Sequence, residues 1–102
     1  MSVNVEETLG EAANLEKEYE WLQASELYEQ AQGMVDEGDY FRRGEVQESI
    51  GYSLQRAAFQ AESREEFLER IHGAVEAYGR ARGLYEMVAD EGEVGRALRA
   101  GL

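Results

Sequence analysis

Residues 44–83, GEVQESIGYSLQRAAFQAESREEFLERIHGAVEAYGRARG, decide the fold of this chain. Within them, Ser63-Arg64-Glu65-Glu66 has the pattern of a capping box, in which the Ser63 hydroxyl accepts from the N–H of Glu66 and the Glu66 carboxylate accepts from the N–H of Ser63. A helix is therefore predicted to begin at Arg64. Apolar residues recur at helical intervals on both sides of the box, at Val46, Ile50, Leu54, Ala57 and Ala61 before it and at Phe67, Ile71, Val75, Tyr78, Tyr85 and Val88 after it. Since this spacing marks one face of a helix, the stretch predicts two amphipathic helices joined by a tight turn, an αα-hairpin.

The composition predicts an all-α protein. The 102 residues include no proline, and because proline breaks helices and marks loops, its absence favours a chain that is almost all helix. The absence of cysteine excludes disulfides, thiolate zinc sites and cysteine nucleophiles. No apolar run approaches the roughly 18 residues that span a bilayer, and the N-terminus lacks the basic and apolar segments of a secretion signal. We therefore expect a cytoplasmic protein with no membrane partner.

The charge of the chain is strongly negative and unevenly placed. Twenty-two acidic residues against ten basic ones give a net charge of −12, and residues 1–41 carry eleven of the acids against Lys17 alone. Such a surface argues against nucleic acid and favours a basic partner. Because Lys17 is the only lysine, the charge pattern also predicts adaptation to high intracellular salt. An acidic protein from an arginine-rich genome is the alternative.

Five helices are predicted, over about residues 5–18, 20–36, 40–62, 64–90 and 94–100, within a single domain over residues 1–102. Asn4-Val5-Glu6-Glu7 repeats the capping-box pattern, so the first helix is expected to begin at Val5. A break near Glu18 is preferred to one continuous helix, because the apolar stripe restarts at Trp21 and a helix of more than about 30 residues is rare in a small domain.

Glycine is expected to end two of these helices. In Glu37-Gly38-Asp39, Gly38 with a positive φ would close one helix and Asp39 would cap the next. Glu91-Gly92-Glu93 resembles that stop and predicts a break before a last amphipathic piece with Val94, Ala97 and Leu98. Further glycines inside predicted helices each cost about 0.5–1 kcal/mol relative to alanine. That cost predicts a closely approaching neighbour helix at Gly33, Gly44, Gly51, Gly73, Gly79 and Gly83.

Comparison of the sequence with itself shows a repeat. Leu9-Gly10-x-x-Ala13 recurs as Ile50-Gly51-x-x-Leu54 and again as Val94-Gly95-x-x-Leu98. The helices that follow the first two also correspond, because Ala24-x-x-x-Tyr28-x-x-Ala31 matches Ala74-x-x-x-Tyr78-x-x-Ala81. A small residue on each side of an aromatic one lets a single ring fill the space between two closely packed helices.

These positions resemble the tetratricopeptide family, whose repeat reads W-x2-L-G-x2-Y in its first helix and A-x3-F-x2-A in its second. The resemblance covers nearly the whole chain as two repeats and a fragment. The chain departs from the family in its longer period, in the missing repeat-ending proline, and in Glu6 and Gln47 at the tryptophan position. Its longer helices are more similar to the relatives found in the soluble NSF-attachment proteins. The resemblance implies antiparallel helical hairpins stacked as a short right-handed superhelix, with an up-down four-helix bundle as the alternative.

The resemblance also implies a concave groove that holds a peptide and is lined by the first helices of successive repeats. By register, the groove residues are Glu7, Glu11 and Asn14 from the first helix with Glu48, Tyr52 and Gln55 from the third. Members that clamp a C-terminal carboxylate need lysine and asparagine where this chain has Glu7 and Glu11, so a Lys- or Arg-bearing segment is the expected ligand. The alternative is that all six are ordinary solvated helix residues.

No catalytic residue, metal site or cofactor is predicted. Glu69-x-x-His72 has the spacing of half a di-iron carboxylate site, but the complete site needs a second such pair and His72 is the only histidine. Four carboxylates crowd the turn between the third and fourth predicted helices and could attract a divalent cation, at Glu62, Glu65, Glu66 and Glu69. The preferred interpretation is that carboxylates at a helix N-terminus favourably meet the macrodipole without any ligand. No phosphate-binding loop and no Ser/His/acid set has local support.

The expected function is that of a non-enzymatic adaptor or scaffold that binds another, basic protein. The chain is expected to be either the first piece of a longer solenoid or a short one that forms a homodimer through its C-terminal helix, because the last helix of a solenoid presents an uncovered apolar face. A self-contained four-helix bundle with a structural or regulatory role is the competing class.

Overall fold

The computed structural model describes residues 4–99, without the side chains of Glu91 and residues 93–99. It contains the helices α1 (Val5–Lys17), α2 (Trp21–Gln32), α3 (Tyr40–Ala58) and α4 (Arg64–Arg99), and the described residues include no strand. The predicted all-α class is confirmed. No helix within this described part is both long and apolar enough to cross a membrane.

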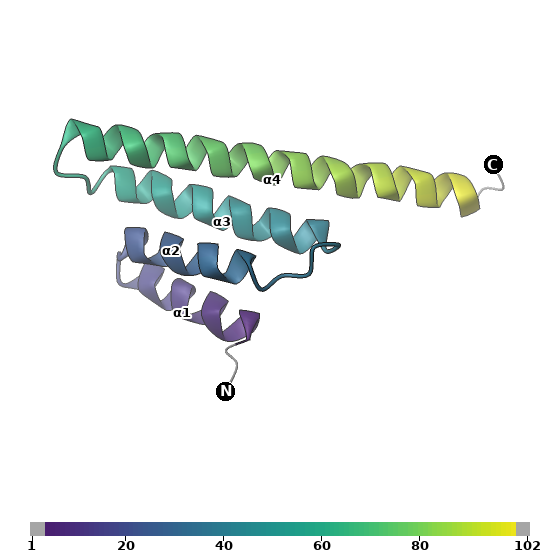
Figure 1. Ribbon diagram of the computed structural model, residues 1–102, viewed down its shortest axis with the longest axis horizontal. Helices are drawn as coiled ribbons and strands as arrows, with labels where there is room; N and C mark the ends of the chain where they lie inside the picture. The colour runs from purple at the N-terminus through teal and green to yellow at the C-terminus, as the bar shows by residue number, and fades with distance from the viewer. Residues whose placement is uncertain (1–3, 100–102) are drawn as a thin grey trace.

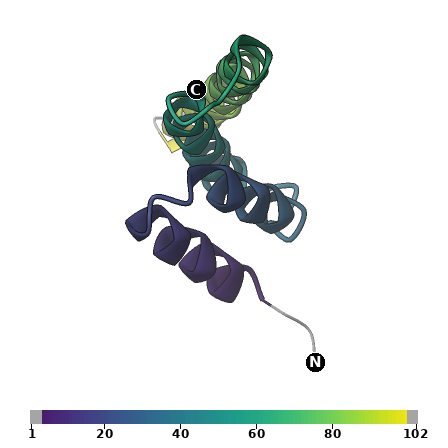
Figure 2. The same ribbon diagram turned by 90° about the vertical axis from the view of Figure 1, so that its left-hand side faces the viewer.

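The helices form an open row in chain order, each antiparallel to the one before it (Figure 1). α1 packs on α2, α2 on α3, and α3 on α4, the last pair having the largest contact. The molecule measures 58 × 36 × 19 Å (Figure 2). α1 and α4 lie at opposite ends of the row, whereas an up-down bundle closed around one centre would bring them together.

The capping residues of the two predicted capping boxes are confirmed. Asn4 Oδ1 accepts from the N–H of Glu7 at 2.9 Å, and Ser63 Oγ accepts from the N–H of Glu66 at 3.1 Å. In the box of Ser63, the Glu66 carboxylate was predicted to accept from the N–H of Ser63. It accepts instead from the N–H of Glu62, at 3.1 Å. The carboxylate therefore satisfies a donor one residue before Ser63 and fixes the entry of α4.

The predicted break near Glu18 is confirmed, and a residue that the sequence did not single out makes the turn. Tyr19 has φ 63°, the left-handed conformation that usually favours glycine. The N–H of Glu20 donates to the Leu15 carbonyl at 2.9 Å and the N–H of Tyr19 donates to the Glu16 carbonyl at 3.0 Å, which together form a Schellman motif. Gln60 Nε2 also donates to the Tyr19 carbonyl at 2.8 Å and ties this turn to the end of α3.

The loop between α2 and α3 contains the predicted cap but not the predicted glycine conformation. Asp39 Oδ1 accepts from the N–H of Arg42 at 3.1 Å and caps α3. Gly38 does not take a positive φ. Its N–H instead donates to Asp36 Oδ1 at 3.1 Å, so aspartate side chains at both ends shape this loop.

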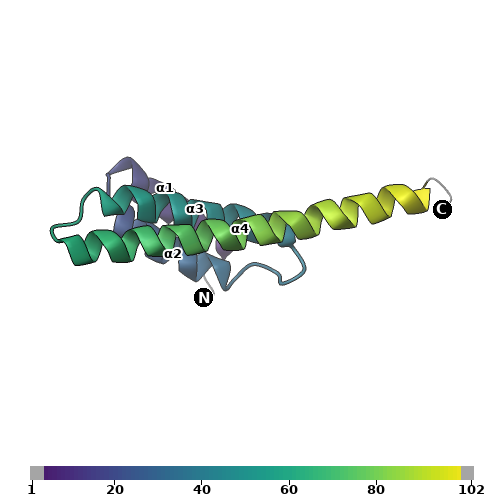
Figure 3. The same ribbon diagram turned by 90° about the horizontal axis from the view of Figure 1, so that it is seen from above.

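The C-terminal ends of α3 and α4 differ from the prediction. α3 ends at Ala58 instead of residue 62, and the Arg70 guanidinium caps it by donating to the Ala57 carbonyl at 2.8 Å. The predicted stop at Glu91-Gly92-Glu93 and the separate helix over 94–100 are wrong, because α4 continues without a break to Arg99 (Figure 3). One glycine costs only about 1 kcal/mol, so helix propagation continues through Gly92.

Small residues let the helices approach one another closely in the core. Its central cluster joins all four helices and consists of Ala12, Ala24, Tyr28, Val46, Ile50 and Ala77. Of the repeated positions, Ala24 and Ala31 are fully buried and Ala74 and Ala81 nearly so, as the repeat predicts. The two rings differ, because Tyr28 is 7 % exposed and Tyr78 is 36 % exposed. The second ring lies at the surface of its hairpin because no fifth helix covers it among the described residues.

The expectation of close approach at helical glycines holds at some positions and fails at others. A Cβ added at Gly44 or Gly51 would lie 2.6 or 2.9 Å from a tyrosine ring of α4, and one added at Gly73 would lie 2.9 Å from Leu54 Cδ1. At Gly33 the only near atom is a carbonyl of its own helix. Gly10, Gly79 and Gly83 have nothing within 4 Å, so Leu9-Gly10 is not the structural equivalent of Ile50-Gly51.

Candidate functional site

The three predicted groove residues on α3 lie together at the surface and contact side chains of neighbouring helices. Glu48 accepts from the Tyr85 hydroxyl at 2.8 Å, and Gln55 Oε1 accepts from the Tyr78 hydroxyl at 3.1 Å. The Tyr52 ring packs against the Trp21 ring of α2 with their centroids 5.5 Å apart. The face that the three residues share is therefore more aromatic than acidic.

The predicted residues of α1 do not join that group. Glu7, Glu11 and Asn14 are exposed, and the polar contacts between α1 and α3 are made by their neighbours, through an ion pair of Glu6 with Arg42 and a hydrogen bond of 3.0 Å from Ser53 to Glu16. Successive helix residues are about 100° apart, so a shift of one position turns a side chain away from the adjoining helix. The six predicted residues are thus two separate sets on the molecular surface.

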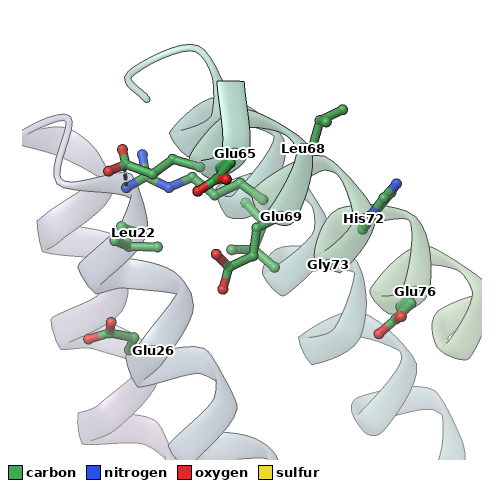
Figure 4. Close-up of a pocket in the computed structure, with 11 residues that line it drawn as sticks. Leu22, Glu26, Glu65, Leu68, Glu69, His72, Gly73 and Glu76 are labelled. Atoms are coloured by element: carbon green, nitrogen blue, oxygen red, sulfur yellow. Dashed lines mark ion pairs between the residues drawn. The ribbon is translucent and has the colours of Figure 1, made fainter. Parts of the chain in front are cut away.

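A larger groove of about 890 Å³ lies between α2 and α4 and crosses the surface of α3. Figure 4 shows Leu22 and Glu26 of α2 on one side and Glu65 and Glu69 of α4 on the other. We call this site the acidic groove. Its full lining is Leu22, Glu26, Leu54, Glu65, Glu66, Leu68, Glu69, Arg70, His72, Gly73 and Glu76.

Most of the negative charge in the acidic groove is left free by the fold. Arg70 is used internally, because its guanidinium caps α3 and lies 3.7 Å from the carboxylate of Glu66, which also caps α4. Glu76 is only weakly paired, since its carboxylate lies 4.0 Å from Arg80 on the exposed side of α4. Glu26, Glu65 and Glu69 also line the groove, and none of them is in an ion pair with a residue that the structure describes. A cationic ligand in the groove would therefore be attracted by all three carboxylates.

The floor and rim of the acidic groove are apolar. Leu54 reaches the groove between α3 and α4 because Gly73 has no side chain, and a Cβ at Gly73 would meet Leu54 Cδ1 at 2.9 Å. Leu22 and Leu68 are partly exposed at the rim. The groove thus offers leucine surface flanked by carboxylates, which is the complement of an amphipathic basic segment.

Sequence reasoning placed the groove elsewhere because it interpreted Glu65 and Glu69 as partners of the helix dipole and weighed Glu69 otherwise only as a metal ligand. A signal was present, since Glu65, Glu69, His72 and Glu76 follow one another at steps of four, three and four and so share one side of α4. These α4 residues form a groove only together with Leu22 and Glu26 of α2, which lie on the other side of α3. Within the described residues, no group of three or more His, Cys, Asp or Glu side chains could hold a metal ion.

Two tyrosines have strongly raised pKa values. Burial of the Tyr85 ring, together with the hydrogen bond to Glu48, raises the pKa of Tyr85 to about 12, and burial beside Glu16 raises the pKa of Tyr28 to about 12. Burial also raises the pKa of Tyr78, to which the charge of Glu48 contributes. The folded state therefore holds these phenol protons more tightly than the unfolded chain, whose tyrosines have a pKa near about 10.

We expect the protein to lose stability in alkaline solution. The contribution of Tyr28 and Tyr85 is fully present below about pH 10 and is lost as the pH rises from about 10 to 12, because the unfolded chain gives up these protons first. Urea unfolding at about pH 8, 10 and 12, with phenolate absorbance recorded on the same samples, measures this loss. The control is the variant Tyr28→Phe/Tyr85→Phe, which should lose less stability over that range. An equal loss in both proteins would contradict the assignment.

In comparisons with protein-family models, with curated proteins and with solved structures, the chain matches none of them.

Proposed function

We propose that this protein is a non-enzymatic adaptor that binds a basic segment of another protein in the acidic groove. The observation that carries the proposal is the set of three unbalanced carboxylates, Glu26, Glu65 and Glu69, around a floor formed by Leu54. An amphipathic segment would place an apolar side chain on Leu54 and its Lys or Arg side chains against the carboxylates. The net charge of −12 would speed the encounter with such a partner.

A charge-reversal experiment tests this proposal. The probe is a synthetic helical peptide of about 14 residues, or about four turns, with one leucine face and lysines on both sides of it. We expect the variant Glu65→Lys/Glu69→Lys to bind the peptide at least about tenfold more weakly than the wild type, a loss of about 1.4 kcal/mol, in fluorescence anisotropy titrations. Raising KCl from about 0.05 to 0.5 M should weaken wild-type binding, because salt screens exposed charges.

The matched control is Glu7→Lys/Glu11→Lys, which changes the net charge equally on the exposed side of α1. We expect it to change the affinity less than about twofold. Thermal unfolding of both variants checks their fold, because lysines near the N-terminus of α4 oppose the helix dipole. Equal losses in the two variants would show that only net charge matters, and a loss confined to the control would place the ligand on α1. Either result would refute the proposed site.

We further propose that the open row is a tetratricopeptide-like hairpin stack. The burial of Ala24, Ala31, Ala74 and Ala81 and the seating of Tyr78 on Gly51 support this assignment. A homodimer through the C-terminal helix remains part of the proposal, and sedimentation of the full chain at high concentration tests it. The apolar positions Val94, Ala97 and Leu98 on which it depends lie outside the residues whose side chains the structure describes.

The proposed cellular setting is a cytoplasm with a high salt concentration. The excess of carboxylates and the single lysine support it. Thermal unfolding in dilute buffer and in molar KCl tests this part, since a melting temperature that does not depend on salt would contradict it.

A further inference from the structure

A second surface, on the other side of α4 from the acidic groove, is built around two tyrosine rings. Glu69 and Tyr78 are nine residues apart, which turns their side chains about 180° from each other around the helix. Tyr78 and Tyr85 lie on Gly51 and Gly44 of α3, where an added Cβ would approach the rings to 2.9 and 2.6 Å. We call the surface formed by these two rings and their α3 partners the tyrosine face.

Each ring is held by its own pair of α3 residues, and the two pairs have the same arrangement. A glycine lies beneath the ring, and a side chain four residues further along α3 accepts a hydrogen bond from the hydroxyl group. The acceptor is Glu48 for Tyr85, at 2.8 Å, and Gln55 for Tyr78, at 3.1 Å. The two glycines, the two acceptors and the two tyrosines are each seven residues apart. The rings are therefore fixed before any ligand arrives, which lowers the entropic cost of binding.

Polar side chains of the tyrosine face are hydrogen-bonded or ion-paired to one another, unlike the carboxylates Glu26, Glu65 and Glu69 of the acidic groove. Glu48 accepts from Tyr85, and Arg82 pairs with Glu86 at 3.1 Å. A hollow of about 400 Å³ lies between the rings. These four side chains line it, together with Tyr78, Ala81 and Ala89. Because these polar groups already have partners, the hollow suits an uncharged ligand. A second copy of the chain is disfavoured, since it would bring another charge of −12.

Further aromatic side chains extend the tyrosine face at both ends. Phe41 packs on Tyr85 with centroids 5.8 Å apart and is 55 % exposed. At the other end, Tyr52 is exposed and packs on Trp21. Two pairs of packed aromatic rings, Trp21 with Tyr52 and Phe41 with Tyr85, thus come from α2, α3 and α4.

The spacing of the rings matches one kind of extended peptide. Seven residues of α4 advance about 10.5 Å between Tyr78 and Tyr85, and one turn of a polyproline II helix advances about 9.3 Å over three residues. We propose that the tyrosine face binds an uncharged proline-rich segment of another protein, with prolines one turn apart seated on Tyr78 and Tyr85.

The polar groups of the face complete the fit to such a segment. Proline residues offer carbonyl acceptors and no N–H donors, so the surface that binds them must donate. Because the Gln55 side-chain oxygen accepts from Tyr78, its amide N–H groups are directed to other acceptors and can donate to a peptide carbonyl. The proposal concerns a different surface from the acidic groove and does not depend on it.

Titration of the full chain with a synthetic decaproline peptide tests the proposal, with a Gly-Ser peptide of equal length as the negative probe. We expect decaproline to shift the NMR signals of the Tyr78 and Tyr85 rings, and its binding to change little with KCl, unlike binding in the acidic groove. Tyr78→Ala and Tyr85→Ala should each weaken binding about tenfold or more, as truncation of an aromatic anchor does. Met87→Ala, at an exposed position of α4 outside both sites, is the control and should leave the affinity unchanged.

Because either alanine variant can lose stability, the ring signals of the wild type remain the primary measurement. Tyr78→Phe adds a second test, since it keeps the ring and should keep most of the affinity. The proposal is overturned if decaproline leaves both rings unshifted, if it shifts Leu22 or Leu54 of the acidic groove instead, or if Met87→Ala weakens binding as much as Tyr78→Ala does. A dimer that Tyr85→Ala dissociates and decaproline does not would assign the face to a second copy, and would also overturn it.

Discussion

Replacing Ile50 by alanine is expected to lower the free energy of unfolding by about 2–5 kcal/mol. Ile50 is 1 % exposed and belongs to the cluster in which Ala12, Tyr28 and Ala77 bring α1, α2 and α4 to α3. Its removal takes away apolar contacts with the other helices and leaves a cavity whose walls are rigid helix backbones. Since a domain of this size is stable by only about 5–15 kcal/mol, the variant should be near the limit of folding.

Urea unfolding followed by circular dichroism measures the effect of Ile50→Ala, which should appear as a lower midpoint with an unchanged slope. The matched control is Val75→Ala on α4, where the wild-type side chain is 64 % exposed, and the expected change is within about 0.5 kcal/mol. A loss below about 1 kcal/mol for Ile50→Ala would mean that α3 is not the centre of the core, and would contradict the packing described above.

Two glycine substitutions are expected to change stability in opposite directions. Gly51→Ala should destabilise the protein by about 1–3 kcal/mol, because its Cβ would lie 2.9 Å from Tyr78 and must displace the ring or separate α3 from α4. Gly10→Ala should stabilise the protein by about 0.5–1 kcal/mol, because nothing lies within 4 Å of the new atom and alanine favours the helix.

Thermal and urea unfolding of the two glycine variants side by side provide the measurement, and Gly79→Ala, another open helical position, should behave like Gly10→Ala. The double variant Gly51→Ala/Tyr78→Ala should recover part of the loss, because the atom that collides with the Cβ is absent. Stabilisation by Gly51→Ala would show that the ring yields at no cost, and the close contact of α3 with α4 would then be unnecessary for stability.

Local sequence determined where most helices begin. Asn4, Asp39 and Ser63 cap three of the predicted helix starts through bonds from N–H groups three residues later. Such bonds involve only neighbouring residues, so the pattern of side chains along the chain is sufficient to predict them. The periodic apolar residues likewise predicted the buried side of α3, including Val46, Ile50 and Ala57.

Helix ends were less well predicted, because they depend on small energies that other contacts outweigh. Gly92 failed to stop α4, since one glycine costs less than the hydrogen bonds that continue the helix. Tyr19 made the left-handed turn after α1 although its residue type disfavours it, and the bond from Gln60 that supports this turn comes from 41 positions further along the chain. No inspection of residues 15–21 alone would find that support.

The sequence by itself determined that this protein is helical, that its chain turns after α1, α2 and α3, and that its surface is acidic. Only the tertiary structure decided which carboxylates line one groove, because α3 separates Glu26 of α2 from Glu65 and Glu69 of α4 and these residues are far apart in the chain. It also decided that the Tyr78 ring packs on Gly51, whereas no atom would lie within 4 Å of a Cβ added at Gly10. The physical reason is that capping hydrogen bonds join residues close together in the chain. A groove, or a glycine beneath a ring, depends on how one helix is rotated relative to another. Packing of the whole row of helices sets that rotation.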